Sequence, residues 1–205
     1  MPRESQKKIT LQSLLEQVGV APGQVVLDVG FRDVSELVGI SSIVGPQGAV
    51  LGIDVDTGYV SEAKQKLAEL SELRIDIQHG SVLRIPSEDK AFDLIFCKGI
   101  LHEVQDLHGA FKELFRVCRP GGFLSIIDIQ RFSRLKFGIY KILTRMKGHS
   151  SVDVYPGFTE DELRVLLEPY GFRVIEYRVF DTVWKMGFIE VNPFLLKAER
   201  KDPGV

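Results

Sequence analysis

The chain of 205 residues has a formal net charge of -2, and 44% of its residues are hydrophobic while 26% are charged. These values are those of one globular domain with a well-buried core, and the charge argues against a general nucleic-acid coat, which needs an excess of Lys and Arg. No apolar run approaches the ~20 residues of a membrane-spanning helix, and the N-terminus lacks the apolar stretch of a secretory signal, so we expect a cytoplasmic location.

Five short apolar segments alternate with helical patterns as far as residue 129. The segments are rich in β-branched residues, which is typical of strands buried on both faces. They cover 25–29, 49–53, 73–77, 92–96 and 123–129. The helical patterns predict helices over 11–18, 33–44, 61–70 and 104–118. Such alternation indicates right-handed βαβ units and a mostly parallel sheet.

The C-terminal third has a different character. Residues 131–147 combine an apolar stripe with six Lys or Arg and no acidic residue. Further on, Thr159 and Glu162 have the spacing of a capping box, which marks a helix start. The remaining predicted elements are a helix over 159–170 and strands over 172–180 and 193–199. No linker divides the chain, so we expect a single domain over 1–205.

Two loops at the carboxyl ends of the predicted strands carry candidate ligand-binding residues. Gly30 follows the first strand, where a glycine lets the backbone turn tightly against a ligand, although many strands end in Gly for structural reasons. Asp54 ends the second strand and could accept both ribose hydroxyls of an adenine cofactor. The alternative role is a helix N-cap, for which Asp56 is better placed.

Four segments together resemble the successive motifs of the class I S-adenosylmethionine-dependent methyltransferases. They are VVLDVG (25–30), GAVLGIDVD (48–56), HGSVLRIPSEDKAFDLIFCKGILHEV (79–104) and LFRVCRPGGFLSIIDI (114–129). The resemblance covers roughly residues 20–130. It implies a Rossmann-like, doubly wound α/β fold with a mostly parallel sheet of seven strands, the last antiparallel. It also implies an enzyme that uses S-adenosylmethionine as its cofactor.

The resemblance also implies a set of cofactor contacts. Gly30 and its neighbours would face the methionine part of the cofactor, and Asp54 would bind the ribose. Val55 would pack on the adenine, while Ser81 and Val82 would flank its amino group. The full expected set is Asp28, Gly30, Phe31, Arg32, Asp54, Val55, Gly80, Ser81, Val82 and Lys98, the last near the sulfonium; no metal site is expected.

Two positions depart from the family pattern. The first loop is usually rich in glycine, whereas here Phe31 follows Gly30 and could narrow the methionine pocket, and Arg32 could pair with the cofactor's carboxylate. The family often has Asp where this chain has Ser81, which keeps a hydroxyl without the charge. These departures support an alternative, a non-catalytic binding protein with the methyltransferase fold. A nicotinamide-dependent oxidoreductase is disfavoured because it would share only the first two motifs.

Candidate catalytic residues follow the fourth strand. The sulfonium already supplies a good leaving group, so the protein would align the reactants, and it needs a base only if the acceptor is protonated. His102 and Glu103 are the best-placed candidates, with Asp128 as a third. A structural role for His102 in a packed loop is the alternative. The acceptor is expected to be a small molecule, of the lipid-like or quinone type that some family members use.

Residues 131–158 are expected to cover the acceptor as a lid or insertion. The basic amphipathic stretch 131–147 has three interpretations: a helix that packs its apolar face on the domain, a lid that attracts an anionic or lipid-like substrate, or a helix on a membrane surface. The sequence does not indicate the oligomeric state.

Overall fold

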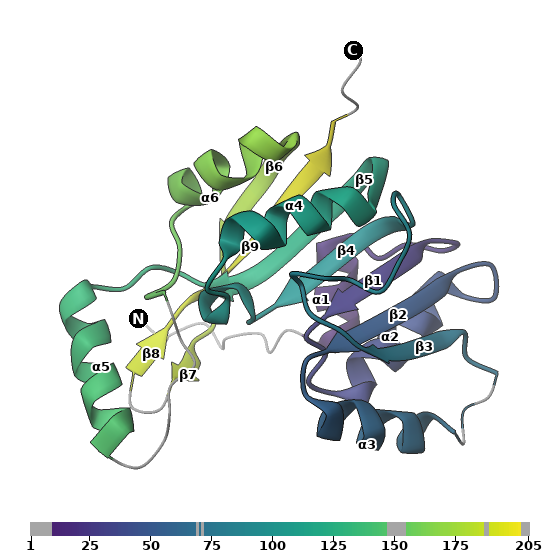
Figure 1. Cartoon of the computed structure of the whole chain (residues 1–205), viewed down its shortest axis with the longest axis horizontal. Helices are drawn as coiled ribbons and strands as arrows, with labels where there is room; N and C mark the ends of the chain where they lie inside the picture. The colour runs from purple at the N-terminus through teal and green to yellow at the C-terminus, as the bar shows by residue number, and fades with distance from the viewer. Residues whose placement is uncertain (1–9, 69, 71, 147–154, 187–188, 202–205) are drawn as a thin grey trace, which may run out of the picture.

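Seven strands form one main sheet in the computed structural model, which describes residues 10–68, 70, 72–146, 155–186 and 189–201 (Figure 1). The predictions for 1–205, 61–70, 131–147 and 131–158 extend in part outside the described residues. The strands are β1 (Val25–Val29), β2 (Ala49–Asp54), β3 (Ile75–His79), β4 (Phe92–Lys98), β5 (Cys118–Ile129), β6 (Phe172–Val179) and β9 (Pro193–Arg200). The helices are α1 (Leu11–Val18), α2 (Val34–Val44), α3 (Thr57–Leu67), α4 (Leu107–Val117), α5 (Arg134–Met146) and α6 (Glu160–Leu167), with 3₁₀ turns η1 (Leu101–Glu103) and η2 (Glu168–Tyr170).

The strand order in the main sheet is β3-β2-β1-β4-β5-β9-β6. β1 runs parallel to β2 and β4, β2 to β3, and β4 to β5, whereas β9 is antiparallel to both its neighbours, β5 and β6. The predicted fold class is confirmed: an α/β, doubly wound, mostly parallel sheet of seven strands with the last antiparallel. The order reverses between β1 and β4, and ligands bind beyond the strand ends at such a switch point.

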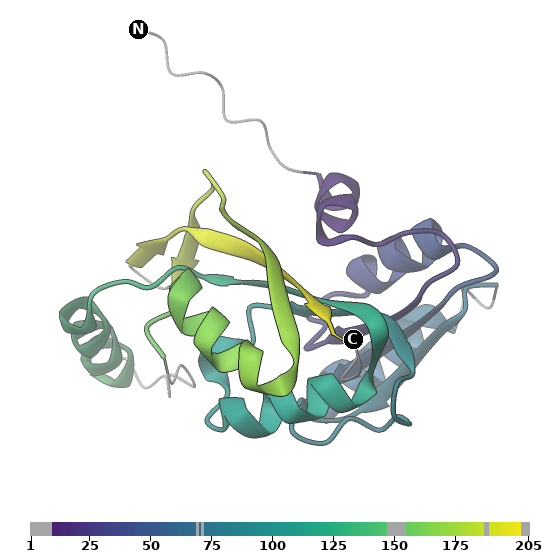
Figure 2. The same cartoon turned by 90° about the horizontal axis from the view of Figure 1, so that it is seen from above.

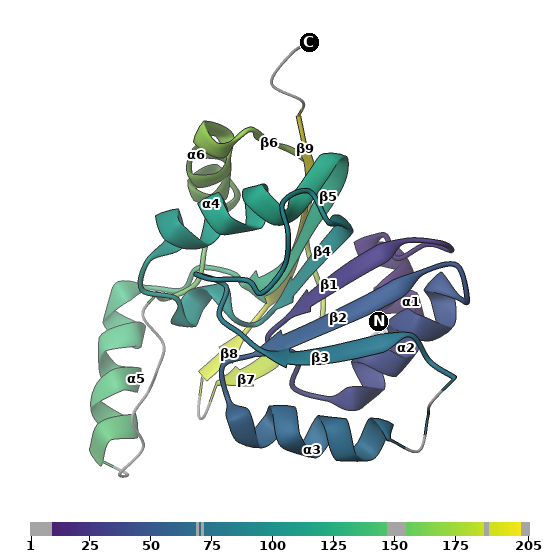
Figure 3. The same cartoon turned by 45° about the vertical axis from the view of Figure 1, so that its right-hand side comes forward.

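Helices cover both faces of the sheet. Successive strand residues point to opposite sides, so each face presents apolar side chains that a helical layer must cover. α1, α2 and α3 lie on one face, and α4 and α6 lie on the other (Figure 2 and Figure 3). In β1, Leu27 shares an apolar core with Phe111 of α4, whereas Val26 shares the opposite core with Leu37 of α2. All four side chains are fully buried, so the two cores fix the sheet between its two helical layers.

Two predicted elements are shifted along the chain. α3 begins at Thr57 instead of residue 61, because the Asp56 carboxylate accepts hydrogen bonds from the backbone N–H of Gly58 (2.7 Å) and Tyr59 (3.2 Å). This first turn carries no apolar stripe, so apolar periodicity does not mark it. β3 covers residues 75–79 instead of 73–77, and it pairs with β2 so that His79 lies opposite Asp54.

A short hairpin between β6 and β9 was not predicted from the sequence. Its strands, β7 (Trp184–Met186) and β8 (Ile189–Val191), pair antiparallel as a separate two-stranded sheet. Each strand has only three residues, too few for the alternation of polar and apolar side chains that identifies a strand in a sequence. The hairpin lies beside α5 and leads directly into β9 at the end of the main sheet (Figure 1).

α5 confirms a helix within 131–147 but not the way it was expected to pack. One of the three interpretations had its apolar stripe pack on the domain, yet the exposed fractions are 75% for Leu135, 46% for Ile139 and 62% for Ile142. The helix instead turns Phe137 and Tyr140 toward a small cluster that contains residues of β5 and the hairpin. The interpretation as an ordinary core-facing helix is therefore wrong for the described part of the stripe.

Three simpler features of the chain concern its thiols, metal ligands and helices. Cys97 and Cys118 are free and buried, and burial raises the pKa of the Cys118 thiol to about 12. Within the described ranges, no three His, Cys, Asp or Glu side chains gather as metal ligands. None of the described helices has the length and apolar character needed to cross a bilayer.

The capping box at the start of α6 gives a test of local stability. The Thr159 hydroxyl accepts from the Glu162 N–H (3.3 Å), and the Glu162 carboxylate accepts from the Thr159 N–H (2.9 Å). We predict that Thr159→Ala lowers the free energy of unfolding by about 1 kcal/mol. In urea denaturation the midpoint should fall with an unchanged slope. Thr182→Ala, at a position that begins no helix, is the control; an equal loss there would contradict the capping role.

Candidate functional site

A cavity of about 620 Å³ opens at the carboxyl ends of β1, β2 and β4. This volume is in the range of small-molecule sites, and the place is the switch point of the sheet. Eight residues predicted from the sequence line it: Gly30, Arg32, Asp54, Val55, Gly80, Ser81, Val82 and Glu103. Four other predicted residues, Asp28, Phe31, Lys98 and His102, are not among its lining residues.

The first wall of the cavity is the loop between β1 and α2. Gly30 has φ 75°, and a Cβ at this position would overlap the side chain of Ile100, so only glycine fits. Its N–H donates to the carbonyl of Ile53 (2.8 Å), which holds the loop against the end of β2. Arg32, two residues after Gly30 in the same loop, is exposed and lines the cavity.

The departure from a glycine-rich loop has a local explanation at Asp33. Its carboxylate accepts a hydrogen bond from the Ser35 N–H (2.9 Å) as the N-cap of α2. Hydrogen bonding to Ser35 lowers the pKa of Asp33. The positive end of the helix therefore faces the chain's own carboxylate instead of being left for a phosphate. This arrangement does not suit the pyrophosphate of a nicotinamide dinucleotide.

Phe31 does not narrow the cavity, contrary to our expectation. Its side chain is 1% exposed and belongs to the apolar core beneath α2. A Cβ added to Gly52 would lie 3.0 Å from the Phe31 ring, so β2 passes directly beside it. The bulky residue is tolerated in the first loop because the ring turns inward and leaves the cavity side to Arg32.

Beneath the first loop lies a buried group of charges. Asp28 and Glu36 are 1% and 3% exposed, and Glu36 forms an ion pair with Lys98. Burial raises the pKa of Asp28 well above its ordinary value, and the Glu36 charge adds to this, while Lys98 opposes it. Among the described residues, Asp28 Oδ2 has no hydrogen-bond partner. Lys98 is thus engaged with Glu36 and does not line the cavity, whereas the resemblance implied a position near the sulfonium.

The two acidic residues at the end of β2 have distinct roles. Both line the cavity, but Asp56 is also the N-cap of α3, as described above, whereas Asp54 accepts from the Asp56 N–H (2.8 Å) and caps no helix. Burial raises the pKa of Asp54, and the nearby Arg32 charge partly opposes this. Of the two alternatives that the sequence left open, the cap role therefore falls to Asp56, and Asp54 presents a carboxylate to the cavity.

The loop after β3 forms the far wall. Gly80 donates its N–H to the Asp54 carbonyl (3.0 Å), which brings the two loops together. The Ser81 hydroxyl accepts from the Leu83 N–H (3.2 Å), and Val82 is buried behind it. Val55 is 66% exposed, so an apolar surface faces the open cavity.

Behind the cavity, η1 holds a buried histidine–carboxylate pair. His102 Nδ1 lies 2.7 Å from Asp128 Oδ1, and Asp128 Oδ2 accepts from the Leu101 N–H (2.9 Å). His102 Nε2 is 3.8 Å from Glu103 Oε1, and Glu103 reaches the cavity. The three side chains therefore form a series, Asp128–His102–Glu103, in which only the last lines the cavity.

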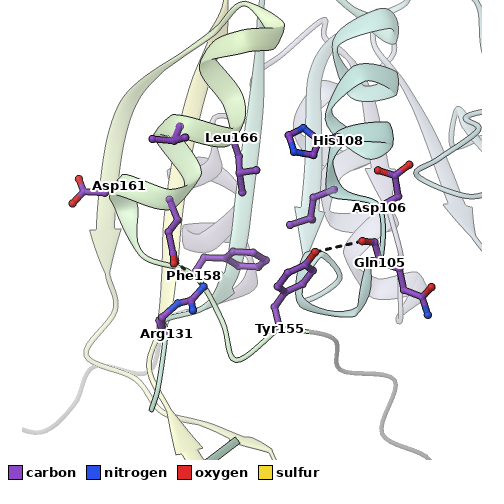
Figure 4. Close-up of a pocket in the computed structure, with 11 residues that line it drawn as sticks. Gln105, Asp106, His108, Arg131, Tyr155, Phe158, Asp161 and Leu166 are labelled. Carbon is purple, nitrogen blue, oxygen red and sulfur yellow. Dashed lines mark hydrogen bonds and ion pairs between the residues drawn. The ribbon is translucent and has the colours of Figure 1, made fainter. Parts of the chain in front are cut away.

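A second cavity of about 500 Å³ lies between α4 and α6 and shares Gln105 with the first. Figure 4 shows Phe158 and Leu166 on one side and Tyr155 beside the start of α4, with the Tyr155 hydroxyl bound to the Gln105 carbonyl (3.4 Å). Arg131, also in its wall, forms an ion pair with Glu162 (2.8 Å). Leu107 and Val165 add to its apolar lining.

Sequence reasoning missed several residues of the first cavity: Val29, Ile53, Asp56, Tyr59, Leu83, Gly99, Ile100, Val104 and Gln105. A signal existed for Tyr59, because it lies one turn into the helix that Asp56 caps. Gly99 has φ 67°, and a Cβ there would lie 3.6 Å from the Trp184 ring, so the β7–β8 hairpin reaches the cavity rim. No local pattern predicts that contact.

Comparison with known proteins agrees with this geometry. A family model described as "Methyltransferase domain" matches residues 27–126. The demethylmenaquinone methyltransferase of Staphylococcus aureus is 26% identical over 193 residues, which cover 85% of this chain and 78% of that protein. The crystal structure of an S-adenosylmethionine-dependent methyltransferase from Aquifex aeolicus has a TM-score of 0.68 at 26% identity, covering 94% of this chain and 90% of that one.

The fold alone does not identify the reaction. The cyclase SpnF has a TM-score of 0.73 at only 15% identity, with 98% of this chain and 84% of that chain covered. The methyltransferase family model and the two methyltransferases at 26% identity are more specific, and they agree with the motifs and the cavity at the switch point. Together these findings support a class I S-adenosylmethionine-dependent methyltransferase.

Proposed function

We propose that the chain binds S-adenosylmethionine in the first cavity and methylates a small, lipid-like acceptor of the quinone type. The observation that carries the acceptor class is the alignment with a demethylmenaquinone methyltransferase over most of both chains. A second, largely apolar cavity beside the cofactor cavity supports the same class, because a quinone with an apolar tail needs room for both its ring and its tail.

The charges around the first cavity fit this cofactor. S-adenosylmethionine carries a sulfonium and an ammonium as well as a carboxylate, and when bound it supplies an electrophilic methyl group. Asp28 offers a buried carboxylate oxygen that no described residue satisfies, which suits a cationic group near the first loop. Arg32 would pair with the carboxylate, and Asp54 would accept from the ribose hydroxyls. Val55 and Val82 would enclose the adenine.

The acceptor would approach from the side of η1. Ile100 and Val104 give this part of the wall an apolar surface, and Glu103 is the acidic side chain that η1 places there. Methylation of a ring carbon beside a hydroxyl releases one proton, so a carboxylate that takes it assists the reaction. We assign this role to Glu103 and place His102 behind it as a positioning residue, oriented by Asp128.

The second cavity would receive the apolar tail. Leu107, Phe158 and Leu166 line it, and Gln105 is common to both cavities, so a long ligand can extend from one to the other. The Arg131–Glu162 ion pair lies in its wall. The largely apolar surface of the cavity favours a lipid-like acceptor over a polar one such as an amino acid.

The cofactor assignment predicts a binding defect at Asp54. Asp54→Ala should weaken S-adenosylmethionine binding more than tenfold in calorimetry, about 1.4 kcal/mol or more, because two ribose hydroxyls lose their acceptor. Asp76→Ala, at an exposed carboxylate on β3 outside the cavity, is the control. The wild-type protein should bind S-adenosylhomocysteine and not NADH; absence of heat with both sulfur cofactors would overturn the proposal.

The buried carboxylate predicts opposite effects on stability and binding. Because the pKa of Asp28 is raised, its ionised form destabilises the ligand-free fold above the ordinary aspartate pKa of about 3.9. Asp28→Asn should therefore raise the melting temperature of the ligand-free protein, with a gap that opens as the pH rises above about 4. The same variant should bind the cationic cofactor more weakly. A lower melting temperature at neutral pH would contradict this account.

The base assignment predicts a selective loss of turnover. Glu103→Gln should lower kcat by about 100- to 10,000-fold with a soluble hydroquinone acceptor, while the cofactor KM changes little. Glu88→Gln, at an exposed carboxylate outside both cavities, is the matched control.

If His102 acts through Glu103, the two substitutions are not additive. His102→Asn should lower kcat, and the double variant should lose little more than Glu103→Gln alone. Full additivity would show that His102 has a separate, structural effect.

A further inference from the structure

α5 presents an apolar stripe that no described residue covers. Leu135, Ile139 and Ile142 follow the four- and three-residue spacing of one helix face, and all three are exposed. Phe137 and Tyr140 lie on the opposite face, where they stack on each other (6.4 Å between ring centroids) and join the cluster with Val191 of β8. The helix is therefore anchored to the body by one face while the other, apolar face points away from it.

Cations flank this stripe. On a helix of 3.6 residues per turn, Lys136 falls on one side of the stripe, and Arg134, Lys141 and Arg145 fall on the other. No acidic residue occurs in α5. The Lys141 ammonium lies over the Phe137 ring (5.5 Å to the centroid), at the border of the anchored face. The outward surface of α5 is thus apolar along its middle and positive along both edges.

We propose that α5 docks this protein on the surface of an anionic lipid bilayer. An apolar stripe between two cationic edges is the arrangement with which an amphipathic helix lies in a lipid interface, its stripe among the acyl chains and its cations among anionic headgroups. Docking deepens the proposed function, because a lipid-like acceptor would be met at such a surface. The biological purpose of docking therefore rests on that proposed function.

The position of α5 agrees with this occupant. Figure 1 and Figure 3 show the helix standing off from the main sheet, beside the β7–β8 hairpin, so a flat surface can reach it. Arg131, three residues before the helix begins, lines the second cavity. A bilayer in contact with α5 would therefore lie near the cavity that we assign to the acceptor's tail.

Two alternatives to a bilayer are disfavoured: a second copy of the chain, and closure of α5 over the chain's own cavities. A second copy packed symmetrically on the same stripe would bring the cationic edges of two helices together, and like charges at an interface are repulsive. Closure of α5 over its own cavities would require the stripe to turn inward, which would break the contacts of Phe137 and Tyr140 with the body. A bilayer satisfies the stripe and the cations without moving the helix.

The test is co-sedimentation of the full chain with vesicles, without cofactor or acceptor. We expect binding to vesicles of equal parts phosphatidylcholine and phosphatidylglycerol, little binding to pure phosphatidylcholine, and a decrease as salt screens the cations. The triple variant Leu135→Gln/Ile139→Gln/Ile142→Gln, which keeps good helix formers, should bind at least tenfold more weakly. Ile175→Gln is the control, since Ile175 lines neither cavity and is 49% exposed on β6, close to the 46% of Ile139.

Three outcomes would overturn the docking proposal. They are absence of wild-type binding to anionic vesicles, equal binding by the triple variant, and sedimentation velocity that shows a self-association which the triple variant abolishes.

A vesicle-free assay with a tailless hydroquinone separates this proposal from the proposed function. Methylation there by the triple variant at the wild-type rate, with vesicle binding lost, supports docking as a role of its own. If neither the wild-type protein nor the triple variant methylates the hydroquinone, while the wild-type protein still binds vesicles, the acceptor assignment alone is overturned.

Discussion

The architecture of the site depends on ionisable groups buried at the junction of β1, α2 and β4. Two buried carboxylates, Asp28 and Glu36, lie close together, and one partly exposed cation, Lys98, pairs with Glu36. Buried charges are costly unless they are paired, and here one carboxylate oxygen of Asp28 has no partner among the described residues. Burial raises the pKa of Asp28, so its ionised form destabilises the ligand-free fold. Under the cofactor assignment proposed above, a cationic ligand over the first loop would stabilise that ionised form and offset the cost.

This view explains how the first loop can depart from the glycine-rich pattern of the family. The loop needs one glycine, Gly30, because only there does the backbone meet Ile100 with a positive φ. Phe31 turns into the core, Arg32 faces the cavity, and Asp33 caps α2. Phe31 has partners in the core and Asp33 has one in the first turn of α2, so both departures from glycine have a structural role. The unusual loop is therefore consistent with cofactor binding and is not in itself a sign of a degenerate site.

The sequence predicted the strands and the loops between them well, because strands buried on both faces and capped helices leave local patterns. Asp54 could be placed at the cavity for the same reason, since strand ends of a parallel sheet meet at one edge, whereas Val55 and Ser81 were expected there only from the family resemblance. The inward turn of Phe31 and the pairing of Lys98 with Glu36 could not be predicted, because they depend on which side of the sheet each side chain faces. The sequence left the packing of the α5 stripe open among three interpretations, since periodicity shows that a helix has an apolar face but not what covers it.

Trp184 gives the molecule an optical property that follows from its place in the fold. It is the one tryptophan of the chain, and its ring touches the site of Gly99 at the cavity rim and packs with the cluster that anchors α5. Indole emission responds to the polarity around the ring. A single unlabelled chromophore therefore monitors both the occupancy of the cavity and the environment of the helix, and changes at the two places can be followed in one titration of the unmodified protein.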